Sequence, residues 1–118
     1  MTLFEKIKEA DKPKLTPIPI EVPEWGLTVY IKQQTVGDRD AFETEAYNAR
    51  QKGQALIDNP RSRFLCRVLC DETGKPLVGP GEFEKLAQLS IAPMQRLFDA
   101  AQKFNKLTDD DIEDLGKN

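Results

Sequence analysis

The residues of this chain that could take part in chemistry lack the partners that a reaction requires. Cys66 and Cys70 lie four residues apart in an apolar stretch. Zinc takes four ligands, and a nucleophilic cysteine needs a base such as histidine, but the sequence contains no histidine. Because a cytosolic setting keeps cysteines reduced, we interpret both as small buried hydrophobic residues.

The carboxylates form no recognisable catalytic or metal-binding set. Pairs for acid–base chemistry could come from Glu43, Glu45, Asp71 and Glu72, but nothing indicates a raised pKa or an oxyanion hole. The three glycines Gly74, Gly79 and Gly81 are not followed by the lysine and hydroxyl of a phosphate-binding loop. We therefore predict turn glycines, no catalytic residue, no cofactor and no enzymatic activity.

An acidic run near the end of the chain, Asp109–Asp111 with Glu113 and Asp114, has the composition of a calcium site. However, no glycine follows at the sixth position of a twelve-residue calcium loop. We interpret the run as the first turn of a helix capped by Thr108, where each negative charge contributes about 0.3 to 1 kcal/mol. The alternative function is a docking surface for a basic partner segment.

Length and charge bound the class of protein. The chain has 118 residues, which is long enough to bury one hydrophobic core. Its net charge of -3 repels the phosphates of nucleic acid. No apolar run approaches the roughly 20 residues of a membrane helix, and the first six residues do not resemble a secretory signal. We expect a cytoplasmic protein that binds neither nucleic acid nor membrane.

The N-terminal region combines a short helix with a hairpin. Apolar residues at helical spacing from Leu3 to Ala10 predict a helix that Pro13 ends, followed by a linker to Pro17. We therefore divide the chain into residues 1–17, a helix and linker, and residues 18–118, a single α+β domain. Alternating apolar residues predict strands at 18–22 and 27–31, joined by a turn at 23–26. Pro19 confines the first strand to a sheet edge, or turns its missing donor outward.

Helical patterns dominate the remainder. They span residues 38–53, 60–69, 83–89 and 91–107, with a last helix after Thr108. Leu77 and Val78 form either a short third strand or an extended link. The predicted fold class is α+β and mainly helical, with an N-terminal β-hairpin followed by a compact set of about four to five helices.

Three segments in this order resemble the small tail assembly chaperones of long-tailed, siphovirus-like bacteriophages. The first contains Val22-Pro23-Glu24-Trp25-Gly26 and the strand after it, and the second is Gly37-Asp38-Arg39-Asp40-Ala41-Phe42-Glu43. The third runs from Asp71-Glu72-Thr73-Gly74-Lys75-Pro76-Leu77 to the helix ending Phe104-Asn105-Lys106-Leu107-Thr108. The conjunction, rather than any single motif, carries the resemblance.

The resemblance implies a late protein in the host bacterial cytoplasm that binds the tape measure protein while major tail tube subunits polymerise around it. Such a chaperone is absent from the finished virion. Self-association between copies is a further expectation, because the client is elongated. The alternative is a structural head-tail adaptor that stays in the particle, and the two functions differ in whether purified virions contain the protein.

The predicted partner-binding surfaces are exposed apolar positions on the terminal helices and the hairpin turn. Large apolar residues on an amphipathic helix can lie in the groove of a client helix, although each can equally belong to the core. The predicted partner-binding residues are Leu3, Phe4, Ile7, Trp25, Phe104, Ile112 and Leu115.

The resemblance also implies a longer form made by ribosomal frameshifting near the end of the short one. Codons for Leu115-Gly116-Lys117 can spell the heptamer G GGA AAG, on which a ribosome can step back one base. We predict that the gene carries this heptamer with an overlapping frame beyond it. Nucleotide sequencing checks the prediction, and the absence of the heptamer would argue against a long form.

Overall fold

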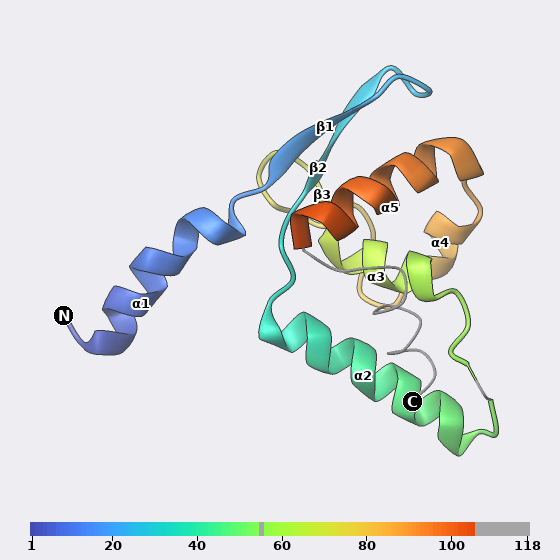
Figure 1. Cartoon of the computed structure of the whole chain (residues 1–118), viewed down its shortest axis with the longest axis horizontal. Coiled ribbons are helices and arrows are strands. Elements are labelled where there is room, and N and C mark those ends of the chain that lie inside the picture. The colour runs from blue at the N-terminus through green and yellow to red at the C-terminus, as the bar shows by residue number, and fades with distance from the viewer. Residues whose placement is uncertain (55, 106–118) are drawn as a thin grey trace.

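A three-stranded antiparallel sheet and a group of helices make up the described part of the chain, residues 1–54 and 56–105, in a computed structural model (Figure 1). The predicted fold class, mainly helical α+β with an N-terminal hairpin, is confirmed. The elements are α1 (Leu3–Asp11), the 3-10 helix η1 (Lys12–Leu15), β1 (Ile18–Val22), β2 (Leu27–Ile31), α2 (Val36–Gln51), α3 (Pro60–Val68), β3 (Leu69–Cys70), α4 (Phe83–Ala87) and α5 (Ile91–Asn105).

The predicted hairpin is present, with Ile18 opposite Ile31 and Val22 opposite Leu27. The strand order β1-β2-β3 leaves β1 at an edge, so the edge position predicted for Pro19 is confirmed. The turn is closed by hydrogen bonds from the backbone N–H of Trp25 and Gly26. Gly26 has φ of 64°, a conformation that glycine adopts without steric cost.

The third strand lies in a place that the sequence did not indicate. Helix α3 ends at Val68, and Leu69–Cys70 pairs with Tyr30 and Ile31, so the predicted helix over residues 60–69 was one residue too long. Both residues of β3 are at most 2% exposed, because the sheet and the helices enclose them. A continuous apolar run does not reveal where a buried helix becomes a buried strand. Leu77 and Val78 lie in a bend, so they form neither the predicted third strand nor an extended link, and the neighbouring Pro76 makes an isolated bridge to Cys70.

The N-terminal helix extends away from the other elements (Figure 1). Its side chains are all exposed. Part of the predicted linker is instead η1, in which Pro13 occupies an early helical position that needs no N–H donor. The division into residues 1–17 and a domain from residue 18 stays a prediction.

Helix α2 begins with a capping box that joins Thr35 and Asp38. The Thr35 hydroxyl accepts from the Asp38 backbone N–H at 3.1 Å, and the Asp38 carboxylate accepts from the Thr35 backbone N–H at 2.9 Å. The helix predicted over residues 38–53 therefore begins and ends two residues earlier, and its face with Phe42, Ala46 and Ala49 is buried. None of the described helices combines the length and apolarity that crossing a membrane requires.

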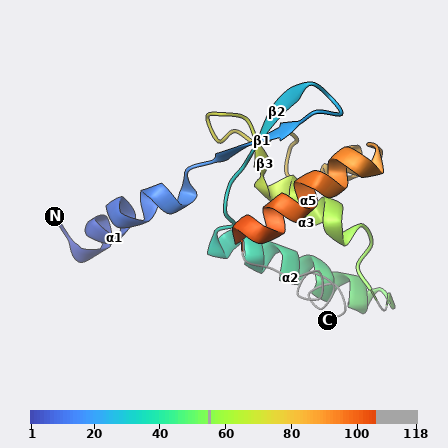
Figure 2. The same ribbon diagram turned by 45° about the horizontal axis from the view of Figure 1, so that its top comes forward.

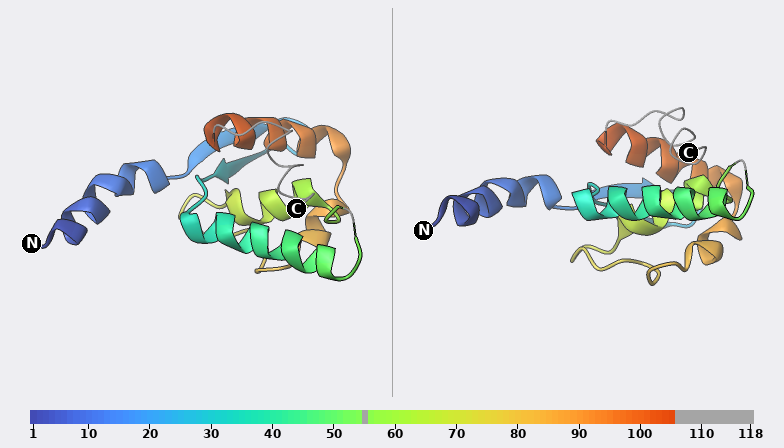
Figure 3. Two further views of the ribbon diagram at one scale, coloured as in Figure 1. Left: turned by 60° about the horizontal axis from the view of Figure 1, so that its bottom comes forward. Right: turned by 90° about the horizontal axis from the view of Figure 1, so that it is seen from below.

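Helix α3 lies at the centre of the helical group and contacts α2, α4 and α5 (Figure 3). Its buried residues Phe64 and Leu65 join Val68 in the core. The ring of Phe64 meets the ring of Phe98 of α5 edge-on, with centroids 6.0 Å apart. Helix α5 in turn packs along β1, so it links the helical group to the sheet (Figure 2).

The predicted last helix, its cap Thr108 and the acidic run lie outside the described residues. The same holds for Ile112 and Leu115. Helix α5 is described as far as Asn105, whereas its predicted end was residue 107. The last helix, its cap and the partner-binding role of Ile112 and Leu115 therefore stay predictions.

We predict that Phe98→Ala lowers the free energy of unfolding by about 3 to 5 kcal/mol. Phe98 is 1% exposed and contacts both α3 and the rest of the core, so truncation leaves a cavity. Urea denaturation followed by circular dichroism measures the change. The control is Leu77→Ala, at a 47% exposed position, which should change stability by less than about 0.5 kcal/mol.

Candidate partner-binding surfaces

A cluster of exposed apolar side chains lies on α1. Leu3, Phe4 and Ile7 are 74%, 68% and 52% exposed. The helix forms because Thr2 caps it, its hydroxyl accepting from the Glu5 backbone N–H at 3.1 Å. Three large apolar side chains on a projecting helix without buried residues form a surface suited to contact with another molecule.

The hairpin turn carries Trp25, which is half-buried and packs against the core. The adjacent Glu24 carboxylate accepts hydrogen bonds from Arg96 of α5 at 3.0 to 3.3 Å. These hydrogen bonds hold the pKa of Glu24 below its ordinary value, with smaller help from backbone hydrogen bonding. The ion pair therefore fixes the turn on α5 and leaves part of the Trp25 ring accessible.

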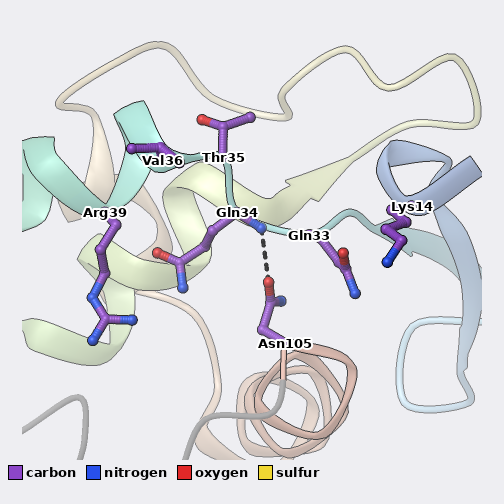
Figure 4. Close-up of a pocket in the computed structure, with 7 residues that line it drawn as sticks. All are labelled: Lys14, Gln33, Gln34, Thr35, Val36, Arg39 and Asn105. Atoms are coloured by element: carbon purple, nitrogen blue, oxygen red, sulfur yellow. Dashed lines mark hydrogen bonds between the residues drawn. The ribbon is translucent and has the colours of Figure 1, made fainter. Parts of the chain in front are cut away.

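Phe104 is also half-buried against the core, at the last described turn of α5. Its carbonyl oxygen accepts from Gln33 Nε2 at 3.3 Å. The Asn105 side chain accepts from the Gln34 backbone N–H at 2.7 Å and donates to the Ala101 carbonyl oxygen at 2.9 Å. The bonds from Gln33 and Gln34 join the end of α5 to the segment between β2 and α2, and Figure 4 shows the bond between Gln34 and Asn105.

A polar cavity of about 520 Å³ opens beside these bonds (Figure 4). Its cationic groups come from η1 and α2, and its amides come from the β2–α2 segment and α5. Sequence reasoning missed it because its parts lie far apart in the chain. The lining residues are Lys14, Gln33, Gln34, Thr35, Val36, Arg39 and Asn105.

A smaller and mostly apolar pocket of about 280 Å³ lies where α3, α4 and α5 meet. Leu89 and Ile91 at its rim are 46% and 71% exposed. Their exposure was not predicted, because the helical pattern assigned Ile91 to an apolar face. Leu65, Leu86, Met94 and Phe98 also line the pocket.

Two of the carboxylates considered for acid–base chemistry, Glu45 and Asp71, have structural contacts. Glu45 of α2 pairs with Arg63 at 2.7 Å and also with Arg67, both on α3. Asp71 accepts from the Thr73 and Lys75 backbone N–H groups, which closes a turn. Hydrogen bonds, first of all from Thr73, hold the pKa of Asp71 below its ordinary value. A lowered pKa favours the charged form and does not prepare a general acid.

Cys66 and Cys70 are buried thiols, which confirms their interpretation as core residues. Their Sγ atoms donate to the carbonyl oxygens of Gly79 and Tyr30, each at 3.5 Å. Desolvation raises the pKa of both thiols, so neither is activated as a thiolate.

We predict that Glu24→Gln lowers stability near neutral pH but has no effect in acid. Because the folded-state pKa of Glu24 lies below 4.5, the carboxylate contributes stability above pH 4.5 and loses it as the pH falls through the folded value. Urea denaturation of both proteins across this range measures the difference, which should be small because the pair is exposed. Glu21→Gln, on β1 and without an ion pair among the described residues, is the control. A deficit that persists in acid would contradict the assignment.

Comparisons with known proteins give a likeness in fold. No protein-family model matches the chain, and no curated protein matches it. Among solved structures, the tail assembly chaperone of bacteriophage HK97 is similar, with a TM-score of 0.58 and 17% sequence identity. The match covers 85% of this chain and 97% of the HK97 chain. The chain therefore has a fold similar to that of a phage tail assembly chaperone over most of its length.

Proposed function

We propose that this protein is a tail assembly chaperone of a long-tailed bacteriophage and acts by binding rather than by catalysis. Its client is the tape measure protein, which it covers in the host cytoplasm while major tail tube subunits polymerise. The observation that supports the proposal is the fold shared with the HK97 chaperone over nearly the whole length of that protein. The sequence resemblance, which rests on the order of three segments, points to the same class of protein.

The physical problem of such a chaperone is to cover apolar stripes reversibly. A long helical client exposes apolar surface before the tube encloses it, and large exposed patches aggregate. Burying a Leu, Ile or Phe side chain completely stabilises a complex by about 1.5 to 3 kcal/mol, before the loss of entropy on binding is subtracted. A surface of three such residues therefore binds weakly, and many copies on one client supply avidity.

We assign the first client contact to α1. Leu3, Phe4 and Ile7 are already exposed, so binding them requires no rearrangement of the core. Trp25 and Phe104 are proposed as secondary contacts because each has part of its ring packed on the core. An amphipathic helix that binds a client helix through one face is a common mode of recognition.

We predict that the protein co-purifies with the tape measure protein and keeps it soluble when the two are co-expressed. Phe4→Asp and Ile7→Asp should each reduce the recovered client several-fold, because a carboxylate cannot be desolvated in an apolar contact. The measurement is the amount of soluble client bound to an affinity-tagged chain. Both variants should keep the wild-type denaturation midpoint, since neither side chain is buried.

The matched control is Leu77→Asp, an exposed apolar position in a loop far from α1 in sequence, which should leave client recovery unchanged. Equal loss in all three variants would remove α1 as the contact.

Mass spectrometry of purified virions tests the class of function, because a chaperone should be absent and a head-tail adaptor present.

A further inference from the structure

The charged residues of α1 are arranged around its apolar stripe in an ordered way. With about 3.6 residues per turn, Leu3, Ile7 and Ala10 lie on one side, and Phe4 forms one border of the stripe. Lys6 lies at the opposite border. Lys8 lies beyond Phe4, with its Nζ atom 5.9 Å from the centroid of the Phe4 ring.

The carboxylates of the same helix mostly lie elsewhere. By the same geometry, Glu5 and Glu9 are on the side opposite the stripe, whereas Asp11, the last residue of the helix, lies on the side of Ile7 and Phe4. Glu9 is already paired with Lys12 at 3.1 Å. Neither Lys6 nor Lys8 forms an ion pair with any residue that the structure describes, and both are exposed. Lys6 and Lys8 thus border the exposed apolar stripe without a carboxylate partner among the described residues, and Lys8 contacts only the Phe4 ring.

From this arrangement we propose that α1 recognises a partner helix whose apolar stripe is bordered by Asp or Glu. When two helices pack, their axes lie about 8 to 10 Å apart and the residues beside the apolar seam meet across it. Lysines in these positions attract carboxylates and repel other cations. The helical form of the partner rests on the proposed function, whereas the preference for acidic borders rests on the geometry of α1.

The same observations favour a protein partner over an anionic membrane. Residues 3–15, which include the exposed η1, contain Lys6, Lys8, Lys12 and Lys14 but also Glu5, Glu9 and Asp11, so this projecting segment has a net charge of only +1. Surface binding to anionic lipid depends on an excess of basic residues and a broad apolar face. The two lysines favour a partner whose carboxylates lie opposite them when its apolar residues contact the stripe.

The test uses the full chain and two synthetic helices of about 21 residues, long enough to be helical in water. Both carry leucine at helical spacing, and they differ only in having glutamate or lysine beside the stripe. Fluorescence anisotropy measures the binding of each labelled peptide. Wild-type protein should bind the glutamate peptide at least about fivefold more tightly, as expected for two exposed charge pairs.

Charge reversal provides the decisive comparison. The double variant Lys6→Glu with Lys8→Glu should prefer the lysine peptide, because the sign of the border has changed. The matched double variant Lys75→Glu with Lys103→Glu changes the net charge equally at exposed positions away from α1, and it should bind like wild type. Circular dichroism and urea denaturation verify that both variants are folded.

Three outcomes would overturn the inference. The first is equal or undetectable binding of the two peptides. The second is binding of the wild-type protein to phosphatidylglycerol vesicles in place of the glutamate peptide. The third is dimerisation through α1, detected by sedimentation, that blocks binding of the peptide. The co-expression experiment separates the two proposals. Capture of the tape measure protein that survives the Lys6→Glu, Lys8→Glu change contradicts this inference alone. A failure of wild type to capture the client contradicts the proposed function, even where the peptide preference holds.

Discussion

The packing of α3 against α2, α4 and α5 is the constraint on which the rest of the structure depends. Four of its nine residues are buried, and the chain continues from it directly into the buried strand β3. A helix enclosed on several sides requires apolar residues around much of its circumference, and the apolar run from Phe64 supplies them. Because β3 completes the sheet, the position of α3 also fixes the hairpin relative to the helices.

Ion pairs beside this core also connect α3 to its neighbours. Arg63 and Arg67 of α3 share Glu45 of α2, and Arg63 also contacts Asp58 at 2.7 Å. Burial opposes the charge of Arg63, but the hydrogen bonds to Glu45 and Asp58 outweigh it and raise the pKa of Arg63. The Arg63 guanidinium lies 3.9 Å from the ring centroid of Phe83 at the start of α4. One side chain therefore links three helices, and its charge remains compensated.

The residues that stabilise the fold are separate from those of the exposed helix α1. The core binds α2 through α5 to the sheet, whereas α1 contributes no buried residue and carries an unsatisfied apolar stripe. Changes on α1 can therefore alter binding with little effect on folding. This separation suits the chaperone that we propose, which would bind weakly, cover a client in many copies and then leave.

The sequence by itself determined the hairpin, its edge proline, the helical pattern over most of α2 and the burial of both cysteines. These features follow from local signals: alternation, turn residues and apolar spacing. It also excluded histidine chemistry and indicated the apolar stripe of α1, because composition and short-range period are visible without a fold. Only the tertiary structure decided that Leu69–Cys70 is the third strand, that Glu45 compensates two arginines, and that Asn105 closes a polar cavity with Gln34. Each of these depends on residues distant in the chain, whose meeting is set by the packing around α3 and not by any local pattern.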